Sequence, residues 1–137
     1  MDTRFSSAIH TLILIAESAK PLTSEHIAER VGTNASYIRK ITGLLKKEGI
    51  IESRRGISGF SLKPKAENLT LLRIYRAVNG GGKTRFFDMH KNPSDKHIGH
   101  VLSGMFEDIE DAFSRSLAGK TLADCIGGVR KTSGAEG

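Results

Sequence analysis

The sequence predicts a mainly α-helical protein with a small β-wing, in which a winged helix-turn-helix domain is followed by one long C-terminal helix. Three observations predict this fold class. Two short amphipathic helices are separated by a three-residue break, a glycine-containing hairpin comes directly after them, and a long amphipathic pattern lies near the end of the chain.

The helix-turn-helix is predicted from apolar spacing and cap residues. A first helix fits residues 4–19, where apolar residues recur every three or four positions. Thr23 is a good N-cap for a second helix, which Gly32 ends, and Asn34 can cap a third helix that runs to about Glu48. The short break between the second and third helices is the spacing of a helix-turn-helix.

The segment IIESRRGISGFSL is typical of two short strands around a turn. The strands are expected at residues 50–52 and 60–62, and Gly56 and Gly59 supply conformational freedom at the tip. A hairpin directly after a helix-turn-helix is a wing.

Two further helices are predicted in the rest of the chain. One fits residues 68–78, and the glycine-rich break and aperiodic loop that follow extend to residue 97. The other carries an apolar stripe of about five turns, which either folds back on its own domain or pairs with a second copy. Its length and its two phenylalanines favour pairing. The predicted dimerisation residues are Ile98, Val101, Leu102, Met105, Phe106, Ile109, Phe113 and Leu117.

The charge of the chain favours a polyanionic partner. The 137 residues carry a formal net charge of +6, with a sequence pI of about 9.7. The excess is focused between residues 36 and 55, where six basic residues face two acidic ones, a local net charge of +4. Double-stranded DNA is the partner that a basic helix-turn-helix would bind.

The third helix has the composition of a recognition helix. Opposite its apolar stripe, its polar residues share one surface, and arginine on such a surface can read guanine through two hydrogen bonds. The wing carries Arg54 and Arg55, and an arginine on a wing can enter the minor groove. Arg55 is the better placed of the two because it lies next to Gly56. The alternative is a solvated helix face and a solvated hairpin tip. The predicted DNA-binding residues are Thr23, Ser24, Ser36, Tyr37, Arg39, Lys40, Lys47, Arg54, Arg55, Gly56 and Ser58.

The order of these motifs resembles a known family. Residues 22–62, together with LLRIYRAVNG and TLADCI, are similar to the Rrf-type bacterial winged-helix transcriptional regulators (IscR/NsrR/CymR-like) over about residues 1–125. The resemblance implies a homodimeric regulator, here a repressor on a palindromic operator, joined mainly through the long C-terminal helix. It also implies that the start of the third helix, including Ser36, Tyr37, Arg39 and Lys40, faces the major groove and that Arg55 faces the minor groove.

The chain departs from the cluster-binding members of that family. Those members carry three cysteines in the loop before the dimer helix, whereas the one cysteine here is Cys125. Thiolates are the usual ligands of iron–sulfur clusters, so we expect no cluster, and the chain is most similar to the cluster-free YwnA-like branch. His90, His97 and His100 fit no compact metal motif, and a buried, inert Cys125 is favoured over a reactive one. We therefore expect no cofactor and no metal site.

Other function classes are disfavoured. The sequence contains no recognisable catalytic motif, and its apolar runs are too short to span a bilayer. We expect a cytoplasmic protein that is not an enzyme, whose partners are double-stranded DNA, a second copy of itself and a small-molecule or protein effector, with no membrane partner. The alternatives are a protein-interaction module acting with a metabolic enzyme, and a metal- or redox-dependent sensor.

Four segments follow from these patterns. They are a winged helix-turn-helix DNA-binding domain (1–65), a connecting helix and sensor loop (66–97), a dimerisation helix with a C-terminal segment (98–126), and a disordered tail (127–137).

Overall fold

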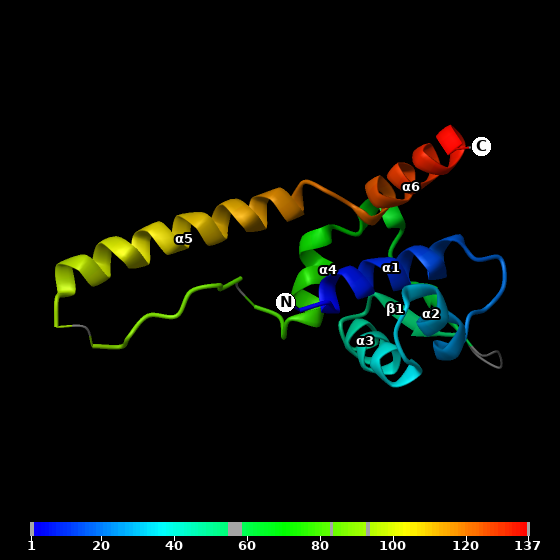
Figure 1. Cartoon of the computed structure of the whole chain (residues 1–137), viewed down its shortest axis with the longest axis horizontal. Coiled ribbons are helices and arrows are strands. Elements are labelled where there is room, and N and C mark those ends of the chain that lie inside the picture. Colours follow the sequence, from blue (N-terminus) through cyan, green and yellow to red (C-terminus); the bar gives the residue numbers. More distant parts are fainter. Residues whose placement is uncertain (1, 55–58, 83, 93, 137) are drawn as a thin grey trace.

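The computed structural model describes residues 2–54, 59–82, 84–92 and 94–136, and it confirms the mainly helical fold with a small wing (Figure 1). Helices α1 to α4 and the wing form one body, and α5 extends away from it. The elements are α1 (Arg4–Glu17), α2 (Ser24–Val31), α3 (Ala35–Lys47), β1 (Ile51–Ser53), β2 (Phe60–Leu62), the 3₁₀ turn η1 (Ala66–Asn68), α4 (Leu71–Val78), α5 (Lys96–Ala118) and α6 (Leu122–Glu136).

The helix-turn-helix is defined by the caps that the sequence predicts. The Thr23 hydroxyl accepts a hydrogen bond from the His26 backbone N–H (3.2 Å), and His26 Nδ1 accepts one from the Thr23 N–H (3.4 Å). Gly32 ends α2 with a φ of 89°, and Asn34 Oδ1 accepts from the Tyr37 N–H (2.9 Å) at the start of α3. These hydrogen bonds satisfy backbone N–H groups that the start of a helix leaves free.

Two clusters of buried side chains hold the body together. Leu14, Ile27, Ala28 and Ile38 pack α2 against α1 and α3. The larger cluster joins α1, α3 and α4 to the wing base and to the start of α6. Its fully buried large side chains are Leu12, Ile41, Leu45, Ile50, Ile51, Leu69, Ile74, Val78 and Leu122.

The wing is a two-stranded antiparallel sheet whose base packs closely against the body. Ile51 pairs with Leu62 and Ser53 with Phe60. Gly59 has a φ of 125°, and a Cβ placed there would lie 2.7 Å from the Pro21 Cβ. Both the left-handed backbone and the close approach therefore require glycine at this position.

The connecting helix begins at Leu71 rather than at Asn68 as predicted. Leu69 is extended and fully buried, and its carbonyl accepts a hydrogen bond from the Leu122 N–H (2.8 Å). The Leu71 N–H donates to the Lys120 carbonyl (2.9 Å). The backbone of residues 69–71, which the sequence predicts as the first turn of the helix, thus pairs with residues 120–122 at the start of α6. The local apolar pattern does not reveal this pairing.

The C-terminal segment also differs from the sequence prediction. We expected residues 127–137 to be disordered, whereas α6 continues through Glu136. Ile126 is buried in the core, and the Arg130 guanidinium donates two hydrogen bonds (2.7 and 2.8 Å) to the Glu17 carboxylate of α1. The ion pair joins two residues that are 113 positions apart in the sequence. The composition of residues 127–137 does not favour a helix, and this contact with α1 cannot be seen in that composition.

Candidate nucleic-acid interface

The recognition-helix candidate α3 has one buried and one exposed face. Ile38, Ile41 and Leu45 are fully buried, so they fix the rotation of the helix against the body. As a result, its polar side chains face outward. The exposed residues of this face are Ser36, Arg39, Lys40, Gly43, Lys46 and Lys47.

Gly43 lies in the middle of this face, where no side chain projects from the helix backbone. An added Cβ would have no heavy atom within 4 Å, other than those of the chain neighbours and of the helix backbone nearby. The glycine is therefore not required by packing within the chain. A surface that a partner must approach closely is a place where glycine is used.

Arg39 is paired with Glu25, a contact that sequence reasoning missed. Its Nη1 lies 3.3 Å from Oε1 of Glu25 in the first turn of α2, and both side chains are exposed. Glu25 also lies in the first turn of α2, where the positive end of the helix dipole favours an anion. The two residues are 14 positions apart on different helices, so no helical spacing rule connects them.

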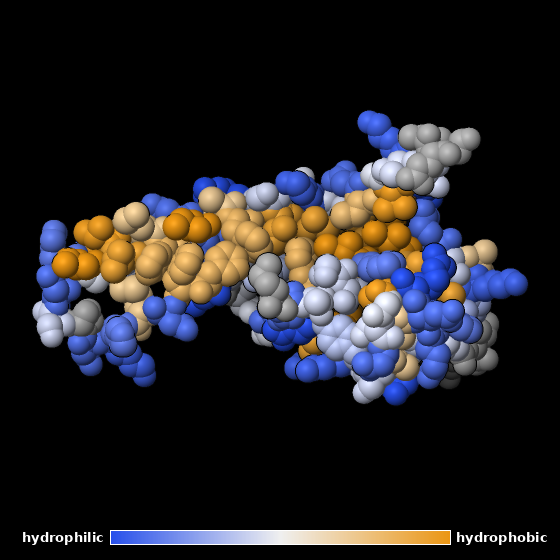
Figure 2. Space-filling model, viewed as in Figure 1, coloured by the Kyte–Doolittle hydropathy of each residue, from blue (hydrophilic) through white to orange (hydrophobic). Residues whose placement is uncertain are grey.

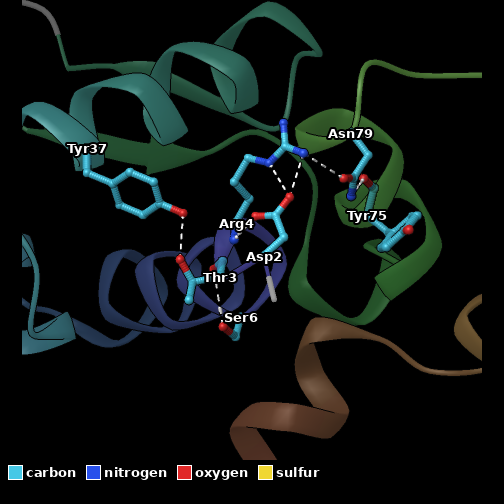
Figure 3. A network of polar contacts seen from close by, with 7 residues as sticks. All are labelled: Asp2, Thr3, Arg4, Ser6, Tyr37, Tyr75 and Asn79. Carbon is cyan, nitrogen blue, oxygen red and sulfur yellow. Dashed lines mark hydrogen bonds and ion pairs between the residues drawn. The ribbon is translucent and has the colours of Figure 1, made fainter.

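Tyr37 is directed toward α1 rather than outward with Arg39 (Figure 3). Its ring is half-buried against the core, and its hydroxyl lies 2.9 Å from the Thr3 hydroxyl. Thr23 and Ser24, also predicted to contact DNA, are half-buried at the start of α2, and the Thr23 hydroxyl is used in the cap.

The N-terminal arm continues this polar network to α4 (Figure 3). Arg4 donates to Asp2 Oδ2 (2.7 Å) and to Asn79 Oδ1 (3.4 Å), and Asn79 donates to the Tyr75 carbonyl (2.9 Å). The hydrogen bonds that Arg4 donates to Asp2, from its guanidinium and from its backbone N–H, lower the pKa of the Asp2 carboxyl, and the Arg4 charge adds to the effect. The arm therefore connects the start of α1 with the end of α4.

The wing carries a further exposed arginine next to the sheet. The Arg54 N–H donates to the Gly59 carbonyl (3.1 Å), which extends the pairing by one residue beyond β1. Arg55, Gly56 and Ser58, which the sequence predicts at the wing tip, lie outside the described residues.

The N-terminal half of α5 presents an apolar surface to solvent. Figure 2 shows hydrophobic residues in a continuous band along this helix. We name as the α5 stripe the large apolar residues of α5 that are between 37% and 55% exposed and share one side of the helix. They are Ile98, Val101, Leu102, Met105 and Ile109.

The C-terminal end of α5 is occupied within its own chain. Leu117 is buried in the core, and the Phe113 ring packs edge-on against Tyr75 with centroids 5.2 Å apart. Phe106 is half-buried and stacks on Phe87 at 4.5 Å. Leu117, which the sequence predicts among the dimerisation residues, is thus buried within the single chain, and its part in a dimer contact stays a prediction.

A buried carboxylate holds the preceding loop against α5. Glu110 is 7% exposed, and its Oε2 accepts hydrogen bonds from the backbone N–H groups of Phe86 and Phe87. Both phenylalanines remain 42% exposed, and their rings pack against Phe113 and Phe106 of α5.

The described residues do not fit an iron site. They contain no group of three His, Cys, Asp or Glu side chains that could hold a metal ion. The whole chain has one cysteine, Cys125, which lies in α6, and burial together with the Asp124 charge raises the pKa of its thiol. A raised pKa disfavours the thiolate that ligates metal. The described helices also include none long and apolar enough to cross a membrane.

Comparison with known proteins agrees with this geometry. The sequence pattern of the Rrf2 family, described as an iron-dependent transcriptional regulator, matches residues 1–128. YwnA of Bacillus subtilis (strain 168), provisionally named an HTH-type transcriptional regulator, is 38% identical over 131 residues, covering 92% of this chain and 96% of YwnA.

Two solved structures share the fold. A crystal structure provisionally described as that of a DNA-binding protein is 38% identical and has a TM-score of 0.76, with 90% of this chain and 98% of that chain covered. IscR from T. potens has a TM-score of 0.74 at 21% identity, with 96% and 89% covered. The resemblance to Rrf-type regulators, and to the YwnA-like branch among them, is confirmed by these findings.

Proposed function

Because the chain belongs to the Rrf2 family of transcriptional regulators, we propose that it binds an operator through α3 and acts as a homodimeric repressor without an iron–sulfur cluster. The observation that carries the DNA-binding role is the outward basic face of α3 on a helix whose other face is fully buried. A helix held in this way can enter a major groove without rotating out of register.

The exposed side chains divide into two kinds of contact. Arg39 and Lys40 lie in the first two turns of α3, from which base edges are reached. Lys46, Lys47 and Arg54 are exposed at the end of α3 and on the wing, where phosphate contacts are expected. Tyr37 is better explained as a positioning residue, because its hydroxyl already bonds Thr3.

A second copy of the chain is the partner that suits the α5 stripe. Five exposed apolar side chains lie together on one helical face, and a contiguous apolar patch of this kind marks an interaction surface. Pairing two α5 helices would bury this surface and place two α3 helices about a two-fold axis. We therefore propose a palindromic operator with half-sites about one helical turn, 10–10.5 base pairs, or a multiple apart.

We propose that a small-molecule or protein effector acts on this regulator, and the structure contains a cavity in which a small molecule could bind. A cavity of about 390 Å³ lies between the loop and α5, bordered by Arg85, Phe87, Phe106 and Glu110 among others. We place the protein in the cytoplasm, where it would meet DNA, and assign it no catalytic activity, because its family is one of regulators.

The test is selection of binding sites from sheared genomic DNA at near-physiological salt. We expect the unaltered protein to recover one palindromic motif. Arg39→Ala should then lose about 1–3 kcal/mol on the selected site and much less on random DNA. Lys131→Ala, which removes one positive charge from the exposed surface of α6, is the control and should lose little on either. Equal losses for Arg39→Ala on both DNAs would exclude a base-reading role.

A further inference from the structure

We infer that Glu25 is a specificity-determining residue, which positions Arg39 for a base and weakens the binding of Arg39 to phosphate. The inference rests on the proposed DNA-binding role of α3. It starts from the contact between Glu25 Oε1 and Arg39 Nη1, which joins the two helices of the helix-turn-helix at 3.3 Å.

The backbone on both sides of this contact is firmly held. Glu25 lies in the first turn of α2, between the Thr23 cap and the fully buried Ile27. Arg39 follows directly after Ile38, which is also fully buried and packs in the same cluster as Ile27. The two side chains therefore meet because α2 and α3 are packed together, and α2 offers the carboxylate at a fixed place beside the recognition helix.

The chemistry of the pair leaves Arg39 able to read a base. A guanidinium has five N–H donors in a planar fork, and Glu25 engages one nitrogen, Nη1. The remaining donors can still reach the two acceptors of a guanine edge. A side chain already held by a carboxylate loses less rotamer freedom when it binds, which favours the one geometry that the pair allows.

The charge of Glu25 acts in the opposite direction on phosphate. A carboxylate beside Arg39 offsets the positive charge that attracts any DNA sequence, and it repels the backbone directly. The side chains are 59% and 68% exposed in the free protein, so the pair contributes little to folding stability. At a DNA interface, where water is displaced, the same pair would matter more.

The experiment compares Glu25→Gln with Glu29→Gln. Both substitutions remove one negative charge from an exposed position of α2, but Glu29 makes no ion pair within the described part of the chain. Dissociation constants are measured for the selected operator and for a random duplex of the same length, over a series of salt concentrations. Thermal unfolding of each variant shows that the fold is kept.

Glu25→Gln should lower the ratio of operator to random affinity by roughly tenfold, the size of one good base contact, while random affinity rises. Glu29→Gln should leave the ratio within about twofold of the unaltered protein, since added positive charge strengthens both complexes alike. In an Arg39→Gln background, Glu25→Gln should no longer change the ratio, because its partner is absent.

Two results would overturn the inference. One is an equal change of the ratio for Glu25→Gln and Glu29→Gln, and the other is an undiminished effect of Glu25→Gln without Arg39. Either result, with an operator still selected by the unaltered protein, leaves the proposed function in place. If the unaltered protein prefers no sequence, the proposed function fails and the inference fails with it.

Discussion

Helices α3 and α5 are both amphipathic, yet they use their apolar faces differently. The apolar face of α3 is fully buried within the chain, and its polar face carries the basic residues. In α5, Leu117 at the C-terminal end is buried, whereas the α5 stripe is exposed. The same periodicity thus marks a core in one helix and an exposed apolar surface in the other. The difference follows from length, because the 23 residues of α5 extend beyond the body that could cover them.

The largest effect on folding is expected in the buried face of α3. Leu45→Ala removes a fully buried side chain from the main cluster, so we expect the free energy of unfolding to fall by about 2–5 kcal/mol. Urea denaturation followed by circular dichroism measures it. Leu102→Ala, on the exposed stripe, is the contrast and should cost much less at concentrations where the protein is monomeric. Similar losses for both would mean that the two faces do not differ.

A charge placed in the α5 stripe should break the dimer that we propose and spare the fold. In Val101→Glu with Met105→Glu, an unpaired carboxylate would have to be buried in each contact, so the dimer dissociation constant should rise by more than about 100-fold. Sedimentation equilibrium measures this, and helix content should be nearly unchanged. His100→Glu, which adds a charge to the other side of α5, should leave the dimer intact. A persistent dimer in the double variant would show that the stripe is not its interface.

Gly43→Ala sharpens the comparison on the exposed face of α3. Space for the methyl group is open, and alanine is the better helix former, so unfolding should cost about 0.5–1 kcal/mol more. If DNA approaches the helix there, operator affinity should fall despite the gain in stability. Thermal unfolding and a binding titration on one preparation test both parts. Unchanged affinity would place the groove contact elsewhere on α3.

The smallest expected effect concerns Cys125 in α6. Burial raises the pKa of its thiol, and the Asp124 charge adds to the shift, so the reactive thiolate is scarce at pH 7. Alkylation by iodoacetamide should be slow there and should accelerate by about tenfold per pH unit up to pH 9, since the thiolate fraction rises as pH approaches a raised pKa. N-acetylcysteine is the control. A rate that levels off below pH 8 would contradict the raised pKa.

Much of the candidate site could be predicted because its signals are local. Caps at Thr23 and Asn34 and the apolar spacing of α3 act over three or four residues, so they are visible in a sequence window. Those signals predicted which residues of α3 face outward, with Tyr37 as the exception. The Tyr37 hydroxyl instead meets Thr3, a residue 34 positions earlier, because α1 lies beside α3.

The sequence by itself determined the fold class, the basic face and the stripe, because periodicity, capping and charge depend on neighbours along the chain. Only the tertiary structure decided where each helix is covered. Leu69 lies outside α4, and its carbonyl accepts a hydrogen bond from Leu122, which follows α5 in the chain. Arg130 of α6 pairs with Glu17 of α1, and Arg39 of α3 pairs with Glu25 of α2. Each of these contacts joins elements separated in sequence, and their meeting depends on how the helices pack in three dimensions.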